Sequence, residues 1–423
     1  MKRHSWVGLL LLASVLPLTA LGQQSPRDVR IDISKGSTRI PILIEPLAVG
    51  GDPQAAGLAQ EVLANDLDMC GVFDVSRSWG GAPIPQTVQA IVGGKWTSSG
   101  REVRLQGEVR DFPARRPILT KEYRGAPSQW RWLVHQFADD IVLQFTGVPG
   151  VARTRVAFAS PHGREKELYV MDLDGANLRP LTTDHSIALS PAWSPDGSLL
   201  LFTSYRGGGG LKIYLAPATG GKVYLISGRA GNNTSPAYAP DGQGIACTLS
   251  QDGNPEIYLL DARGGAPRRL TTGRAIDTSP SWSPTGQNLA FTSDRDGTPQ
   301  VYVMDASGGN VRRLTYDVTY TDSPAWSPNG ETIAFVSRTG GGFDILVCKA
   351  DGTGLRTVAS GGSNENPRWS PDSRHLVFAS NREGGYALYV SDLDDRAPRK
   401  LDTHGMPAMS PAWSPRLASA PSP

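Results

Sequence analysis

The sequence predicts a two-domain protein, in which a small N-terminal α/β domain (a mixed sheet and two helices) precedes a six-bladed all-β propeller. A short phrase of the SPAWSPDG type occurs six times, each repeat unit holds four strand-like segments, and the chain before the repeats alternates strand and helix patterns. The first prolines of the six copies lie 43 to 45 residues apart, at Pro191, Pro236, Pro280, Pro324, Pro367 and Pro411. A period of roughly 40–45 residues is typical of propeller blades.

Residues 1–22 have the pattern of a signal peptide. Lys2 and Arg3 precede an apolar run from Trp6 to Leu18, and Ala20 to Gly22 form a small-residue cleavage site. The apolar run is shorter than the about 20 residues that cross a bilayer. We therefore expect an exported, cleaved chain with no direct membrane insertion, and an uncleaved anchor is the alternative.

The charge balance argues against nucleic-acid binding. The whole chain carries a formal charge of +2, and removal of residues 1–22 with Lys2 and Arg3 brings it to zero. A neutral protein lacks the electrostatic footprint that binds DNA, RNA or anionic lipid. We expect a soluble monomer.

The three cysteines do not form a disulfide scaffold in this prediction. Cys247 and Cys348 fall in strands of non-adjacent repeats, and Cys70 lies in the other domain. We expect all three to be buried small apolar residues, with a bridge as the alternative.

Residues 35–147 are predicted to form the α/β domain. Ile40–Ile44 is a continuous apolar run, as in a central strand. Asp52 and Pro53 supply the N-cap and first-turn proline of a helix that Gly71 ends. A second helix is expected from a Ser128 cap to Gly147. Between the helices, further strands are predicted at Val88–Val92, Glu102–Val109 and Ile118–Tyr123.

Residues 153–417 are predicted to form the propeller. In the third unit the four strands are Pro280–Ser283, Leu289–Ser293, Gln300–Asp305 and Val311–Thr315. Pro and Gly in the intervening SPTG segment favour a tight turn.

The two ends of the array are complementary. The array opens at Arg153 with a second strand and closes at Trp413 with an inner strand, so six complete blades require the two ends to share one blade. Such a closure removes exposed sheet edges. Residues 418–423 are expected to be a disordered tail.

The central aromatic of each phrase has two interpretations. The residues are Trp193, Tyr238, Trp282, Trp326, Trp369 and Trp413. They can pack between adjacent blades, which we favour, or form a ring on which a ligand stacks.

The chain resembles the TolB family, the periplasmic β-propeller component of the Tol–Pal system. The resemblance rests on the signal peptide, the α/β domain, the six SPxWSPDG-type blades, the segment GVPGVARTRVAFAS at the domain junction, and the preceding QWRWLVHQFADDIVLQFTG. It implies a non-enzymatic periplasmic interaction protein without a cofactor. It also implies binding to the Pal lipoprotein and to TolA, in support of outer-membrane invagination during cell division and of outer-membrane integrity.

The resemblance places the two partner sites. The extreme mature N-terminus, residues 23–34, would engage TolA. Within it, apolar and charged residues alternate at Val29, Arg30, Ile31, Asp32 and Ile33. This alternating segment can add to the edge of a partner's sheet, or it can be an edge strand of its own domain. The Pal-facing mouth would be built just before the inner strands, from Asn232, Asn233, Thr234, Asp277, Thr278, Thr321, Asp322, Asn364 and Glu365. Thr278 matches a family pattern, whereas Asn232, where some members carry His, and Ser235 depart from it.

Three alternatives remain open in the sequence. Asp277, Asp322 and Glu365 can hold a cation in the tunnel or be solvated loop residues, and we assign no metal site. A glycan- or peptidoglycan-binding propeller is a second function class. A peptidase-like propeller is a third, but the chain has no G-x-S-x-G, H-E-x-x-H or P-loop motif, so we assign no catalytic residue.

Overall fold

The computed structural model describes residues 39–77, 83–393 and 397–419. The signal peptide at residues 1–22, the segment 23–34 and residues 420–423 of the expected tail lie outside the described residues. Among the described residues no helix is long and apolar enough to cross a membrane.

The first domain is a six-stranded mixed sheet with two long helices, as predicted. The sheet has the order β3-β1-β4-β5-β6, with β2 beside β4; β1 runs parallel to β3 and β4, and the remaining neighbours along that path are antiparallel. The elements are β1 Ile40–Ile44, β2 Ala48–Gly50, α1 Pro53–Met69, β3 Phe73–Arg77, β4 Ala90–Ser98, β5 Val103–Asp111, β6 Pro117–Gly125, a 3₁₀ turn Pro127–Gln129, and α2 Trp130–Thr146.

The helix boundaries follow from local chemistry with one correction. The Asp52 carboxylate accepts a hydrogen bond from the backbone N–H of Gln54, so the predicted N-cap of α1 is confirmed. Gly147 ends α2 in the left-handed conformation that favours glycine. The predicted Ser128 cap is wrong, because Ser128 lies inside the 3₁₀ turn, and Gln129 precedes α2 without a side-chain cap.

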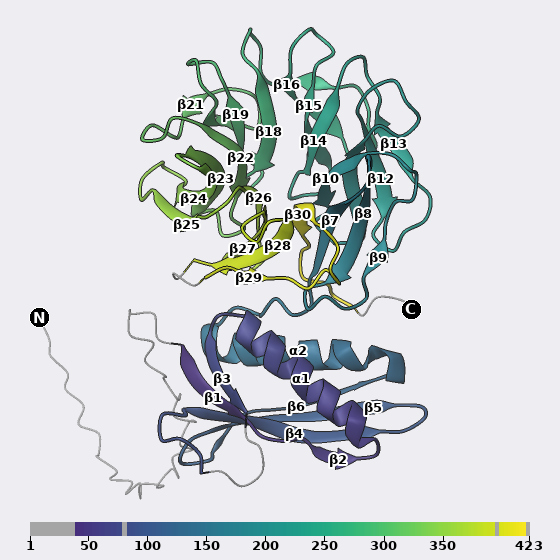
Figure 1. The fold of residues 1–423 in the computed structure, drawn as a ribbon, viewed down its shortest axis with the longest axis vertical. Coiled ribbons are helices and arrows are strands. Elements are labelled where there is room, and N and C mark those ends of the chain that lie inside the picture. Colours follow the sequence, from purple (N-terminus) through teal and green to yellow (C-terminus); the bar gives the residue numbers. More distant parts are fainter. Residues whose placement is uncertain (1–38, 78–82, 394–396, 420–423) are drawn as a thin grey trace, which may run out of the picture. The chain divides into compact units, whose positions relative to one another are not determined.

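The second domain is a six-bladed propeller of four-stranded antiparallel sheets (Figure 1). Five blades each use four consecutive strands, which are β10 Ala188–Trp193, β11 Leu199–Ser204, β12 Lys212–Pro217 and β13 Tyr224–Ser227; β14 Asn233–Tyr238, β15 Gly244–Leu249, β16 Glu256–Asp261 and β17 Arg268–Arg269; β18 Asp277–Trp282, β19 Asn288–Ser293, β20 Gln300–Asp305 and β21 Arg312–Arg313; β22 Thr321–Trp326, β23 Thr332–Thr339, β24 Gly342–Lys349 and β25 Arg356–Ala359; and β26 Asn364–Trp369, β27 His375–Ser380, β28 Ala387–Asp392 and β29 Arg399–Lys400.

The sixth blade joins the two ends of the array, as predicted. Its order is β30-β7-β8-β9, with strands Met409–Trp413, Arg155–His162, Glu165–Asp172 and Arg179–Pro180. The backbone N–H of Arg155 donates to Ser414 Oγ at 2.8 Å, and Trp413 Nε1 donates to Thr154 Oγ1 at 2.8 Å. In Figure 1 the yellow β30 lies beside the blue-green β7. The strand from the C-terminal end of the array thus takes the inner position of the blade that the N-terminal end begins.

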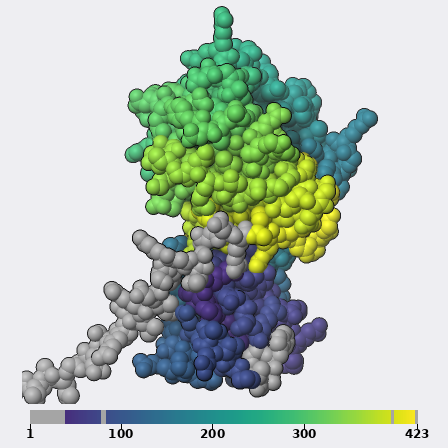
Figure 2. All heavy atoms as spheres, turned by 60° about the vertical axis from the view of Figure 1, so that its left-hand side comes forward, coloured from purple at the N-terminus to yellow at the C-terminus, as the bar shows by residue number. Residues whose placement is uncertain are grey.

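The aromatic of each phrase serves mainly to join blades. Trp193, Trp282 and Trp369 each donate their indole N–H to a backbone carbonyl of the preceding inner strand, at 3.0, 3.2 and 2.8 Å. The indoles also pack into the apolar clusters between sheets. Consecutive blades follow one another across the propeller surface in Figure 2, from green through yellow-green to yellow. The geometry therefore supports inter-blade packing over a stacking platform.

A buried ionic cluster connects α1, α2 and the turn after β8. His135 Nδ1 lies 2.6 Å from Asp66 Oδ2, its Nε2 lies 3.7 Å from Asp174 Oδ2, and Arg131 pairs with Asp174. Burial alone would lower the pKa of His135, but the adjacent Asp66 carboxylate outweighs it and holds that pKa above its usual range. Burial raises the pKa of Asp66. His135 is therefore a structural residue that favours its charged form.

The three cysteines are free and buried, which confirms the prediction for Cys70, Cys247 and Cys348. Burial raises the pKa of each thiol to about 12. Such thiols are protonated at neutral pH and are inert packing groups.

Candidate functional site: the mouth and central cavity of the propeller

The six inner strands surround a cavity of about 460 Å³. Each inner strand contains a two-residue β-bulge, which consists of the first proline of the phrase and the residue before it. At this bulge the pairing register with the second strand shifts. The residue before each proline has a left-handed backbone, with φ between 47° and 55°, at Ser190, Ser235, Ser279, Ser323, Asn366 and Ser410. The Ser-Pro pair of the repeat therefore shapes the wall of the cavity as well as the strand.

The predicted mouth residues three positions before each proline are buried. Asn233, Asp277, Thr321 and Asn364 are at most 1% exposed, and each begins its inner strand. The Asn233 amide donates to the carbonyls of Leu211 and Arg229. These side chains hold the loops at the mouth in place from within.

The same position carries a buried ion pair in the third blade. Both carboxylate oxygens of Asp277 lie 3.2 Å from Arg295 Nη2. Burial raises the pKa of Asp277, and the Ser293 hydroxyl and Arg295 oppose that shift. Arg295 also stacks on the ring of Tyr302, with 4.8 Å between the guanidinium carbon and the ring centroid. Asp277 therefore already has a cationic partner within the blade.

The predicted residues two positions before each proline remain accessible. Thr234, Thr278, Asp322 and Glu365 are half-buried. Asp322 Oδ1 accepts from Thr292 Oγ1 at 2.9 Å, and Glu365 Oε1 accepts from the Tyr386 hydroxyl at 2.5 Å. The structure thus places these four side chains at equivalent positions on four neighbouring inner strands.

Asn232 is exposed on the loop that leads into β14. Its backbone N–H donates to Ser250 Oγ at 2.8 Å, and its carbonyl accepts from the Ser250 N–H at 3.0 Å. These two bonds fix the loop, and Asn232 itself is exposed. Each of these four inner strands begins with one buried and then two half-buried residues, so the mouth residue three positions before the proline is covered and the next one is accessible.

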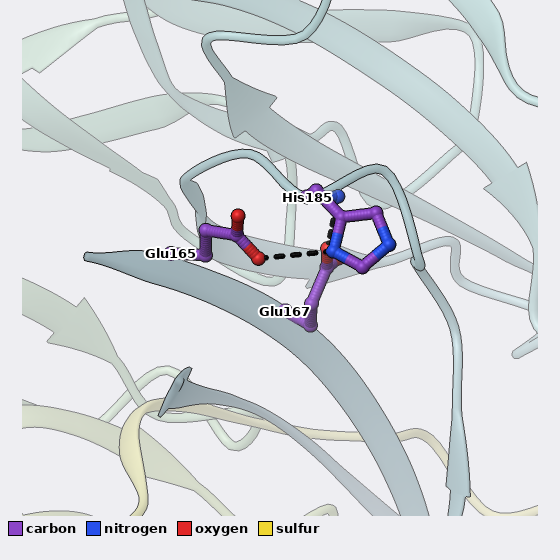
Figure 3. A group of neighbouring side chains, drawn as sticks. All are labelled: Glu165, Glu167 and His185. Atoms are coloured by element: carbon purple, nitrogen blue, oxygen red, sulfur yellow. Dashed lines mark hydrogen bonds and ion pairs between the residues drawn. The ribbon is translucent and has the colours of Figure 1, made fainter. Parts of the chain in front are cut away.

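One group of metal-ligating side chains lies elsewhere on the propeller. Within the described part of the chain, Glu165, Glu167 and His185 are the group of three whose ligand atoms approach closely enough to hold an ion (Figure 3). Glu167 is hydrogen-bonded to Thr182 Oγ1 and to the His185 backbone N–H, and His185 Nδ1 lies 3.1 Å from Glu165 Oε2.

Equivalent positions in two other blades explain Glu167 without a metal. Glu256 Oε2 accepts from Thr271 Oγ1 at 2.5 Å, and Gln300 Oε1 accepts from Thr315 Oγ1 at 2.6 Å. Because a neutral glutamine makes the same contact, the position serves to join the third strand of a blade to the end of its fourth. We assign no metal to this group.

Six four-stranded blades around an axial cavity, preceded by a small α/β domain, define a two-domain β-propeller protein. A family model described as the TolB β-propeller domain matches residues 142–417. The chain belongs to this family.

Three relatives illustrate the likeness. A protein described as a TolB homolog from Chlorobium chlorochromatii is 38% identical over 60% of this chain and 61% of its own length. A Tol-Pal system protein TolB from Desulfosudis oleivorans is 38% identical over 39% of this chain and 37% of its own length. The matched regions thus span less than two thirds of these relatives. The crystal structure of TolB from Acinetobacter baumannii superimposes with a TM-score of 0.81 at 25% identity, covering 89% of this chain and 97% of that one.

Proposed function

We propose that this chain is a non-enzymatic periplasmic component of the Tol–Pal system. It binds Pal at the propeller mouth and TolA through its mature N-terminus, and it thereby supports outer-membrane invagination during division and outer-membrane integrity. Support comes from the family assignment, from relatives that carry the Tol-Pal name, and from the likeness to a TolB crystal structure over both domains.

The observation that carries the Pal site is the arrangement of the mouth. Thr234, Thr278, Asp322 and Glu365 occupy equivalent, half-buried positions on four inner strands around one axis. Their side chains are neutral or acidic, and buried residues behind them fix their backbones. A rigid polar rim of this kind suits a protein partner, because little conformational entropy is lost when it is covered.

A pair of arginine substitutions tests the Pal site. Thr278→Arg places a long charged side chain in the mouth and should weaken binding to the soluble domain of Pal at least tenfold, or about 1.4 kcal/mol. Gln287→Arg is the matched control, because Gln287 is exposed in the turn beyond the other end of the same inner strand. Calorimetric titration measures both. Equal affinities for the two variants, or glycan binding with no binding to Pal, contradict the proposal.

A deletion tests the TolA site separately. Removal of residues 23–34 should abolish TolA binding while the circular dichroism spectrum and Pal affinity stay unchanged. The segment holds Val29, Ile31 and Ile33 in alternation with Arg30 and Asp32, which suits addition to a partner's sheet edge. Retained TolA binding would show that another surface makes the contact.

A further inference from the structure

One inner strand departs from its five counterparts inside the cavity. The second residue after the bulge serine or asparagine is Ala192, Ala237, Ser281, Ala325 and Ala412 in five blades, and Arg368 in the remaining one. These residues share one register, since each pairs with the second strand of its blade directly after the bulge. The repeat therefore needs only a small side chain here, and the arginine is not required by the scaffold.

Arg368 is the only charged side chain among the described residues that line the cavity. The rest of the wall consists of serine, proline, alanine, asparagine, tyrosine and tryptophan. Burial lowers the pKa of Arg368, and the nearby Asp322 carboxylate opposes that shift. Arg368 is half-buried in this otherwise neutral wall, and a cation that has lost part of its hydration attracts an anion.

The Arg368 guanidinium has more N–H donors than the one hydrogen bond described for it uses. Arg368 Nη1 donates to the carbonyl of Pro367 at 2.9 Å, and a guanidinium carries five N–H groups. In the described part of the chain no carboxylate forms an ion pair with it. The Asp322 carboxylate on the preceding blade is the charged group that raises the pKa of Arg368 against the effect of burial. However, Asp322 Oδ1 already accepts hydrogen bonds from Thr292 Oγ1 and from the Ser323 N–H.

We propose that the central cavity is a binding site for a carboxylate, which Arg368 receives inside the propeller. A carboxylate matches the planar fork of a guanidinium with two parallel hydrogen bonds and a single balancing charge. A doubly charged phosphate would leave one charge unbalanced between neutral walls. The proline and tryptophan surfaces favour an apolar body behind the carboxylate, and about 460 Å³ is in the range of small-molecule pockets.

The hydrogen-bond donors of the carboxylate site do not depend on the protein that covers the propeller mouth. Its donors belong to the propeller itself, where Ser190, Ser235 and Ser279 line the cavity together with Arg368. A hydroxyl rotates to donate to a bound anion. The carboxylate can belong to a free small acid or to the end of a peptide that enters the tunnel.

Titration calorimetry on the intact protein tests the site with N-acetylglycine and its neutral analogue N-acetylglycinamide. The native protein should bind the acid at least tenfold more tightly than the amide, because a hydrogen bond between charged partners replaces a neutral one. Arg368→Ala should bind both compounds equally, and Arg368→Lys should retain part of the preference. Equal binding of acid and amide to the native protein, or no binding of the acid at millimolar concentration, overturns the proposal.

Two controls separate the site from folding and from general charge. Arg368→Ala should unfold at the same temperature as the native protein or higher, since four of the other blades carry alanine at this position and a poorly solvated charge is removed. Arg356→Ala removes an exposed arginine at a blade rim and should keep the preference for the acid. Loss of the preference in Arg356→Ala, or its persistence in Arg368→Ala, also overturns the proposal.

A peptide pair identifies the source of the carboxylate. A glycine-ending hexapeptide is compared with its C-terminally amidated form. An acid preference in the peptide shows that the cavity admits chain ends, and an acid preference confined to N-acetylglycine shows that it takes free small acids. Either result supports the carboxylate site.

Discussion

Trp413 closes the propeller ring, and replacing it should weaken the sixth blade, which joins the two ends of the array, more than any other. Its side chain is 7% exposed and packs with Val156, Phe158 and Val377 between the last two sheets. Truncating a buried tryptophan to alanine costs ~3–5 kcal/mol. The loss of the bond from Trp413 Nε1 to Thr154 Oγ1 contributes about 1 kcal/mol of that total.

Hydrogen exchange followed by mass spectrometry localises the effect of Trp413→Ala. Protection should fall in β7, which pairs with β30, and in β8, which pairs with β7, before it falls in β23 and β24. Trp326→Ala is the matched control, because the Trp326 indole is half-buried and donates to Gly330 within its own blade. A loss of protection spread evenly over all six blades in Trp413→Ala, or none in β7, would refute the closure argument.

Two further perturbations test the first domain. The pKa of His135 is raised to about 9 and that of Asp66 to about 6, so their pairing stabilises the fold at neutral pH and loses that effect as the pH rises through the folded pKa of His135. The stability difference between native protein and His135→Asn, from urea titrations, should therefore shrink between neutral and alkaline pH, and a constant difference would contradict the pairing. Gly107→Ala should destabilise the domain by ~1–3 kcal/mol, since a Cβ there would lie 2.5 Å from the Phe137 ring, and unchanged thermal unfolding would show that α2 can shift freely.

The repeat made most of the propeller predictable. Pro and Gly at fixed offsets set the turns, alternating apolar residues set the strands, and the phase at Arg153 and Trp413 indicated a shared blade. In the first domain Asp52 and Gly147 marked helix ends correctly. Ser128 does not mark the start of α2, because it lies inside the 3₁₀ turn Pro127–Gln129 that precedes this helix.

The site was less predictable, since it depends on which way a side chain points. Asn233 and Thr234 are neighbours in sequence, yet one is buried and the other lies half-exposed in the mouth. Arg368 departs from the alanine or serine of the other copies in the sequence, but only the structure shows that this position lines the cavity. The left-handed backbone of the serine or asparagine before each proline had no signal in the sequence, because the residue before a proline favours an extended conformation.

A hydrogen-exchange footprint of the complex tests most directly the proposed binding of Pal at the propeller mouth. Bound Pal should slow exchange in the loops that lead into β14, β18, β22 and β26 and leave the turns at the opposite ends of these strands unchanged. Slowed exchange confined to those opposite turns, or no footprint on the propeller under saturating Pal, would contradict the account.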